Sequence, residues 1–131
     1  MPPVFLKLEE VLEIHQDQTE RYGGDAGIRD LGLLQSAVAM PQATFGGQFL
    51  HEDLYAMASA YLYHIVQNHP FLDGNKRTGT VAALVFLEMN DVPVDIPEPE
   101  LVDFVLLVAT GNTDKPQIAR FLREHAAPSI S

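Results

Sequence analysis

The chain has 131 residues, no cysteine and a formal net charge of −10. This length gives room for one modest hydrophobic core, and the lack of cysteine excludes disulfides and thiolate metal sites. The acidic balance argues against a nucleic-acid-binding role because it repels phosphates, and no apolar run is long enough to cross a membrane. We therefore expect a single domain over residues 1–131, and, since the N-terminus lacks the segments of a signal peptide, a cytoplasmic one.

Apolar residues at helical spacing predict a first helix over Phe5–Tyr22, with Val11 and His15 on its buried face. Gly23-Gly24 is typical of a helix C-cap. Asp30 is a good N-cap for a short second helix, Leu31–Met40, which Pro41 ends because a residue before proline disfavours the helical conformation. The first third of the chain is therefore predicted to be helical.

The region 42–50 contains Gly46-Gly47 and has no helical period, so we expect a hairpin-like loop with one exposed aromatic side chain. A long apolar helix follows over Glu52–Asn68, and a second, nearly all-apolar helix over Thr78–Met89. Acidic residues favour the start of another helix at Glu98–Ala109, and Thr113 or Asp114 caps the last one. Residues 126–131 are expected to fray. The fold class is an all-α bundle of about six helices.

The run His69-Pro-Phe-Leu-Asp-Gly-Asn-Lys-Arg-Thr-Gly79 joins the two central helices. His69 is a candidate general base, since histidine titrates near physiological pH. Asp73 offers the hard oxygen ligands that Mg²⁺ prefers, and Lys76 and Arg77 bring two cations to the same place. The loop leads into a helix N-terminus, which attracts anions. Together these features indicate phosphate-transfer chemistry, with Phe71 as an apolar anchor of the loop.

These residues resemble the signature of the Fic/Doc superfamily, His-x-Phe-x-Asp/Glu-Gly/Ala-Asn-Gly/Lys-Arg, at every position. Lys76, and Thr80 where most Fic proteins have a second Arg, match the Doc (death-on-curing) toxin branch. Arg21-Tyr22-Gly23-Gly24 and the segment Ala109–Glu124 also resemble Doc proteins. The resemblance implies the Fic/Doc fold, in which residues 42–50 form a flap that positions a target protein. An ordinary helix connection is an equal alternative for that segment.

The resemblance also implies the chemistry. His69 would deprotonate a target hydroxyl, Asp73 would hold Mg²⁺, Gly74 and Asn75 would help to cradle the phosphates of ATP, and Lys76 and Arg77 would neutralise them. Doc-branch proteins are kinases that phosphorylate elongation factor Tu, arrest translation and are silenced by a Phd-type antitoxin. The sequence has no internal Ser/Thr-x-x-x-Glu-Gly/Asn inhibitory motif, which fits control by a separate partner.

Two other functions stay open. A Fic-type AMP-transferase is disfavoured by Lys76, and a silent partner-binding module is disfavoured by the complete motif. Gly74 and Gly79 have P-loop spacing, but Thr80 stands where a P-loop needs Lys. A metal hydrolase would need several converging histidines. His64 is interpreted as structural, and no role is assigned to the other three histidines (His15, His51 and His125).

Overall fold

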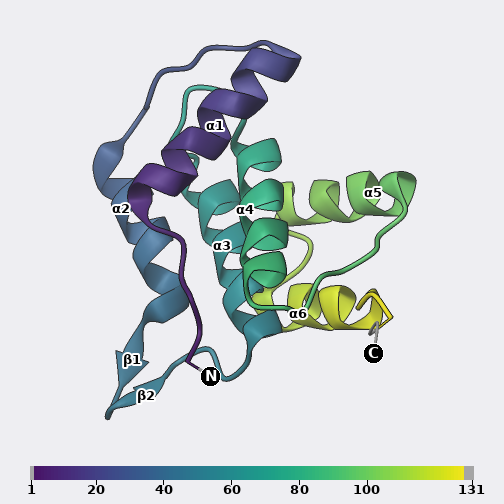
Figure 1. The fold of residues 1–131 in the computed structure, drawn as a ribbon. Helices are drawn as coiled ribbons and strands as arrows, with labels where there is room; N and C mark the ends of the chain where they lie inside the picture. The colour runs from purple at the N-terminus through teal and green to yellow at the C-terminus, as the bar shows by residue number, and fades with distance from the viewer. Residues whose placement is uncertain (1, 129–131) are drawn as a thin grey trace.

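The structure is a computed structural model that describes residues 2–128, and within them the chain forms six α-helices and one short hairpin (Figure 1). This confirms the predicted all-α fold class. The helices are α1 (Leu8–Tyr22), α2 (Leu31–Ala39), α3 (Leu54–Asn68), α4 (Asn75–Met89), α5 (Glu98–Ala109) and α6 (Lys115–Glu124). A 3₁₀ turn, Met40–Gln42, leads from α2 into the antiparallel strands β1 (Thr44–Phe45) and β2 (Gln48–Phe49).

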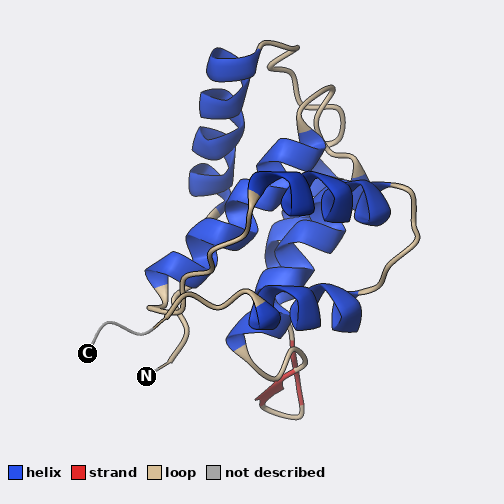
Figure 2. Cartoon of the chain, turned by 90° about the vertical axis from the view of Figure 1, so that its right-hand side faces the viewer, coloured by secondary structure: helices blue, strands red, loops and turns tan. Residues whose placement is uncertain are grey.

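The helices α3 and α4 form the centre of the fold, and the other helices surround them (Figures 1 and 2). Both bury large side chains completely, including Tyr61 from α3 and Phe86 from α4. Gly79 lets the two helices approach closely, because a Cβ there would lie 3.3 Å from the carbonyl oxygen of Leu62 and 3.2 Å from Val66. The second glycine of the P-loop-like spacing therefore has a packing role, and the motif connects this closely packed pair.

Several predicted helix ends are confirmed by capping contacts. Gly23 has a positive φ of 80° after α1, and the Asp30 carboxylate accepts a hydrogen bond from the Leu33 N–H at 2.9 Å. Of the two candidate caps for α6, Asp114 is the one that accepts from the Gln117 N–H, at 3.0 Å. These short-range signals were sufficient to place the ends because each is satisfied within one helical turn.

Other predicted ends were wrong by one to three residues. The first helix begins at Leu8, not Phe5, because the Leu6 N–H donates to the hydroxyl of Tyr61 at 2.9 Å and keeps the chain extended. The third begins at Leu54, since Asp53 caps it, and the second ends at Ala39 where the 3₁₀ turn starts. The fourth begins at Asn75, not Thr78, so part of the motif is helical.

The predicted hairpin is confirmed, with positive φ at both Gly46 and Gly47, as a two-residue turn requires. Phe45 is 85% exposed, but Phe49 is also partly exposed and packs on Phe5, with ring centres 5.6 Å apart. The hairpin adjoins the start of α3, whereas the motif follows its end, and a 15-residue helix spans about 22 Å. A role for the hairpin as a flap at the motif is therefore not supported by its position.

The segment after α6 returns to the connector before α5. The Asp95 N–H donates to the His125 carbonyl at 2.8 Å, and the Ala127 N–H donates to Pro93 at 2.9 Å. Residues 126–127 are thus paired rather than frayed, while residues 129–131 of the predicted tail lie outside the described part of the chain. Within residues 2–128, no helix combines the length and apolarity needed to cross a membrane.

Candidate active site

The motif loop begins at His69, which ends α3 in the left-handed conformation (φ 48°, ψ 54°), an uncommon state for a residue other than glycine. The Arg29 guanidinium holds this end by donating to the carbonyls of Asn68, at 2.8 Å, and of His69. The backbone N–H groups of Arg29 and Asp30 both donate to the Pro70 carbonyl, at 2.7 and 3.0 Å. The α1–α2 connection therefore fixes the backbone on which the exposed His69 side chain is presented.

Phe71 is completely buried, as predicted, and pairs with Ile28 in an isolated antiparallel bridge. The His15 imidazole lies parallel to the Phe71 ring, with centres 3.7 Å apart and planes 6° apart. His15 also forms a 2.8 Å hydrogen bond from Nε2 to the carbonyl of Asp73. It is only 3% exposed, so this contact replaces water that the ring and the carbonyl would otherwise meet.

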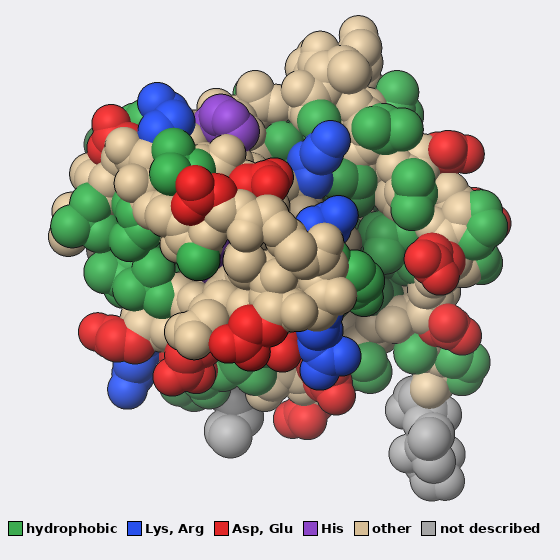
Figure 3. Space-filling view, turned by 90° about the horizontal axis from the view of Figure 1, so that it is seen from above, with side chains coloured by type: hydrophobic (Ala, Val, Ile, Leu, Met, Phe, Trp, Pro, Cys, Tyr) green, Lys and Arg blue, Asp and Glu red, His purple; other side chains and the backbone are tan. Residues whose placement is uncertain are grey.

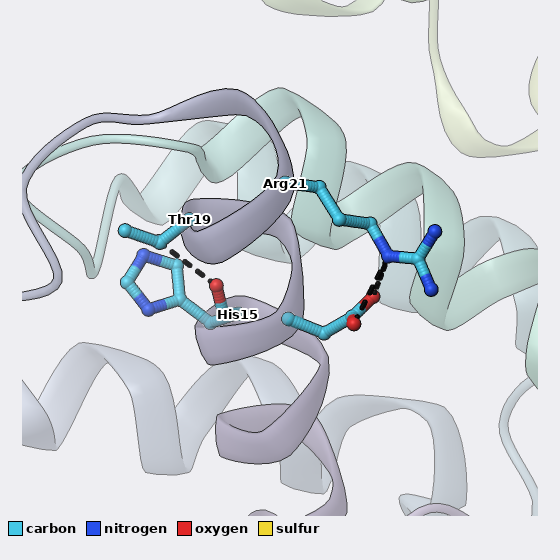
Figure 4. A network of polar contacts seen from close by, with 4 residues as sticks. His15, Thr19 and Arg21 are labelled. Carbon is cyan, nitrogen blue, oxygen red and sulfur yellow. Dashed lines mark hydrogen bonds and ion pairs between the residues drawn. The ribbon is translucent and has the colours of Figure 1, made fainter.

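His15 is a residue that sequence reasoning left without a role. In Figure 4 its ring projects from one side of α1 while Arg21, paired with Asp17 at 2.9 Å, projects from the other. The Thr19 hydroxyl donates back to the His15 carbonyl at 2.9 Å within the same helix. A polar side chain in the buried stripe of α1 was the available signal, but the sequence did not reveal its partner.

The Asn75 side chain points inward and is held by the motif itself. Asn75 is 6% exposed. Its Oδ1 accepts from the Phe71 N–H at 2.9 Å, and its Nδ2 donates to the Phe71 carbonyl at 3.0 Å and to Nδ1 of His69. The amide is therefore fully engaged, and only the backbone N–H of Asn75 is available for a bound anion.

Asp73 and Gly74 form the outer corner of the loop, where the Asp73 side chain is exposed. One Asp73 carboxylate oxygen accepts from the Gly74 N–H at 2.9 Å. Its other oxygen lies where a side chain on Gly24 would be, since a Cβ there would approach to 2.5 Å. The glycine pair after Tyr22 thus makes room for the carboxylate. An exposed carboxylate of this kind fits Mg²⁺ that arrives with a nucleotide, because Mg²⁺ commonly takes one or two carboxylates plus phosphates and water.

Lys76 and Arg77 lie in the exposed first turn of α4. The Thr78 N–H donates the first hydrogen bond of α4, to the carbonyl of the cap residue Gly74. The N–H groups of residues 75–77 therefore lie at a helix N-terminus without intrahelical acceptors. The Arg77 guanidinium lies 5.0 Å from the centre of the Tyr22 ring. Seen from above, this end of the molecule shows basic side chains near a histidine, among acidic and hydrophobic ones (Figure 3).

A cleft of about 400 Å³ begins at these two cations and continues between α1, α4 and α5. Its far wall is apolar, and the residues that line it are Gln18, Tyr22, Lys76, Arg77, Thr80, Val81, Glu98, Leu101, Val102, Val105 and Leu106. The Thr80 hydroxyl donates to the Lys76 carbonyl at 2.7 Å. The cleft therefore combines a cationic end with a surface that suits an apolar ligand.

Two further histidines form a separate cluster between α3 and α6. The Lys115 ammonium donates to Nε2 of His64 at 3.0 Å and to Nε2 of His51 at 3.1 Å. Burial and then the nearby Lys115 charge lower the pKa of His64 to about 4, and the same causes lower the pKa of His51. These contacts agree with a structural role for His64. Within the described residues, no group of three or more acidic or histidine side chains is arranged to bind a metal ion.

Comparisons with known proteins identify the family of the chain. The model of the Fic/DOC family matches residues 5–87, a range that includes the whole motif. Toxin Doc of Mycolicibacterium smegmatis (strain ATCC 700084 / mc(2)155) is 41% identical over 108 residues, which cover 81% of this chain and 83% of that protein. Protein kinase doc of Escherichia phage P1 is 35% identical over 115 residues, which cover 88% of this chain and 90% of that protein.

Proposed function

This chain belongs to the Fic/DOC family, in its Doc branch, and we propose that it is the toxin of a toxin–antitoxin pair and acts as a protein kinase. The observation that carries the proposal is the meeting of an exposed histidine, a carboxylate and a cationic helix N-terminus in one rigid loop. The names of the two relatives, a toxin and a protein kinase, support both parts. We further propose that residues 1–131 act as one Fic/Doc domain.

The proposed reaction transfers the γ-phosphoryl group of ATP to a hydroxyl of a target protein. The hydroxyl oxygen forms a bond to the γ-phosphorus, its proton passes to His69, and ADP leaves with the electrons of the broken P–O bond. Asp73 would hold Mg²⁺, which when bound neutralises phosphate charge. Because phosphoryl transfer depends mainly on positioning and electrostatics, a loop held by Arg29 and His15 suits it.

The phosphates would lie at the start of α4. There the cap residue Gly74 presents no side chain, the free N–H groups of residues 75–77 are donors, and Lys76 and Arg77 supply charge. We favour γ-phosphoryl transfer over AMP transfer because Lys76 adds a cationic side chain to the cradle while Thr80 supplies no second guanidinium. The hydroxyl of Thr80 is instead bonded to its own helix.

We propose elongation factor Tu as the target, on the resemblance to the Doc branch, and hence a cytoplasmic site of action. Three exposed apolar side chains lie on the motif loop, on the α1–α2 segment that holds it and at the first residue of α2, namely Leu72, Ile28 and Leu31. Such side chains around a reactive histidine suit a protein substrate better than a small one. The hairpin lies too far along α3 to share this role.

We also propose that a Phd-type antitoxin silences the protein through the cleft between α1, α4 and α5. The apolar wall of the cleft suits the apolar face of a helix, and its cationic end suits an acidic side chain on that helix. A partner bound there would cover Lys76 and Arg77. It would therefore compete with the nucleotide for the same two cations.

The test of the reaction uses purified protein, elongation factor Tu and ATP labelled at either the α or the γ phosphorus. We expect label on the target from γ-labelled ATP only, and none with His69→Ala. The matched control His125→Ala removes a histidine near the C-terminus and should keep the activity. Label from α-labelled ATP would identify an AMP-transferase instead, and no label from either would favour a silent partner-binding module.

The test of the partner site compares two similarly exposed apolar residues of α5. Val102 lines the cleft and Leu107 does not. We expect Val102→Asp to weaken capture of the co-expressed antitoxin about tenfold or more, because it removes apolar contact and places a charge against the apolar face of the proposed partner helix. Leu107→Asp should retain the antitoxin. Equal capture by both variants would place the antitoxin elsewhere.

A further inference from the structure

The contact between Asn75 and His69 constrains where His69 can carry its proton. The amide of Asn75 meets both backbone polar groups of Phe71, with Oδ1 on the N–H and Nδ2 on the carbonyl. The reversed amide would place its NH₂ against the Phe71 N–H and its oxygen against the Phe71 carbonyl. In a buried site both contacts would be repulsive and unsatisfied, so the orientation of the amide is fixed.

With this orientation, Asn75 presents an N–H group to Nδ1 of His69. Nδ1 must accept and cannot carry a proton of its own. A neutral imidazole has one protonated nitrogen, which is then Nε2. The outward-facing nitrogen of resting His69 is therefore a donor, whereas the proposed base needs a free lone pair there.

We propose that Asn75 is a positioning residue that holds resting His69 in the Nε2–H tautomer, and that His69 becomes a base only when its bond to Asn75 is released. This inference rests on the proposed function for its consequence but not for its geometry. In the resting state, Nε2–H can donate to a phosphate oxygen and orient it. Release exposes a lone pair that accepts the hydroxyl proton in one of two ways. The imidazole rotates and presents the unprotonated Nδ1, or the proton moves from Nε2 to Nδ1 and leaves the lone pair on Nε2.

The primary experiment needs neither substrate nor variant activity. In uniformly ¹⁵N-labelled protein, at a pH where the imidazoles are neutral, long-range ¹H–¹⁵N NMR distinguishes protonated from unprotonated ring nitrogens. The signals of His69 are identified by their loss in His69→Ala. We expect its Nδ1 to be unprotonated and its Nε2 protonated. A proton on Nδ1 would overturn the inference, while a failure to transfer phosphate would not affect this measurement.

A substitution then exchanges donor and acceptor in the contact between residue 75 and His69. Asn75→Asp replaces the donor by a carboxylate that can only accept, so we expect the proton of neutral His69 to move to Nδ1 and both ring nitrogen signals to shift accordingly. Asn112→Asp makes the same charge change at an exposed site and should leave these signals in place. If the Asn75→Asp variant is folded and keeps the Nε2–H tautomer, Asn75 does not set it.

The same position gives a kinetic readout that a purely structural role would not move. Asn75→Ala removes the constraint without supplying a new partner, whereas Asn75→Asp holds His69 with its Nε2 lone pair outward. We expect Asn75→Asp to transfer phosphate faster than Asn75→Ala, and its pH–rate profile to differ from that of the parent. Identical profiles in all three proteins would contradict a gating role for the contact.

Discussion

His69 lies at the end of α3 and His64 lies within it. Their surroundings differ in how exposed the imidazole is and in which ring nitrogen is bound. His69 is exposed, and the structure records a partner on its inner nitrogen, Asn75. His64 is half-buried and its Nε2 is bound to Lys115. The contact behind the His69 ring leaves its outward nitrogen facing solvent, where a substrate can meet it, whereas Lys115 occupies Nε2 of His64.

The two regions also differ in what supports them. The motif loop is held by residues from the first thirty positions, through Arg29, the Ile28 bridge and the stacked ring of His15. The cluster of His51, His64 and Lys115 joins α6 to α3, because the Lys115 ammonium donates to both imidazoles. The contacts around the motif loop leave the His69 side chain exposed, whereas the contacts of Lys115 hold two helices together.

The largest effect should come from removing the exposed histidine. His69→Ala should lower phosphoryl transfer by about 10²–10⁴-fold, the usual cost of losing a general base, while stability changes little because the side chain is exposed. Transfer rates and urea unfolding of parent and variant would measure both. A folded variant that is as active as the parent would show that His69 is not the base.

Much of this site could be predicted from the sequence because its signals are local. The motif, the Asp30 and Asp114 caps and the turn glycines each act within a few residues. The sequence did not reveal contacts made across the fold. His15, on α1, forms a hydrogen bond to the Asp73 carbonyl in the motif loop. The Leu6 N–H donates to the hydroxyl of Tyr61, so Leu6 lies outside the first helix. The burial of the Asn75 amide depended on where α4 begins, which loop residues alone did not indicate.

A smaller effect is expected from the support behind the loop. His15→Ala removes the stacking on Phe71 and the bond to the Asp73 carbonyl, and should destabilise the fold by about 2–3 kcal/mol and lower transfer as the loop loosens. His15→Phe keeps an aromatic ring but loses the hydrogen bond, so it separates the two contributions. Urea unfolding and transfer rates measure them. Unchanged values in His15→Ala would mean that the loop does not depend on α1.

The smallest expected effect is a pH dependence of folding stability that comes from His64, which is bound to Lys115. The pKa of His64 is about 4 in the folded protein, below its ordinary 6.5, chiefly because of burial and then because of Lys115. Between these two values the unfolded chain binds the proton and the folded one does not, so stability is lost as pH falls from about 6.5 towards 4. After allowance for solvent screening, we expect His64 to account for about 1–2 kcal/mol of the loss between pH 7 and pH 5.

A matched variant isolates this contribution. His64→Gln can still accept a hydrogen bond from Lys115 but does not titrate, so its stability should fall less between pH 7 and pH 5 than that of the parent. His125 acts in the opposite direction, because bonds to Phe121 and Glu100 raise its pKa, and it is present in both proteins and cancels. Urea unfolding at both pH values gives the difference. Lys115→Met should reduce the dependence without abolishing it, since burial is the larger cause, and equal losses in parent and His64→Gln would show that His64 titrates normally in the fold.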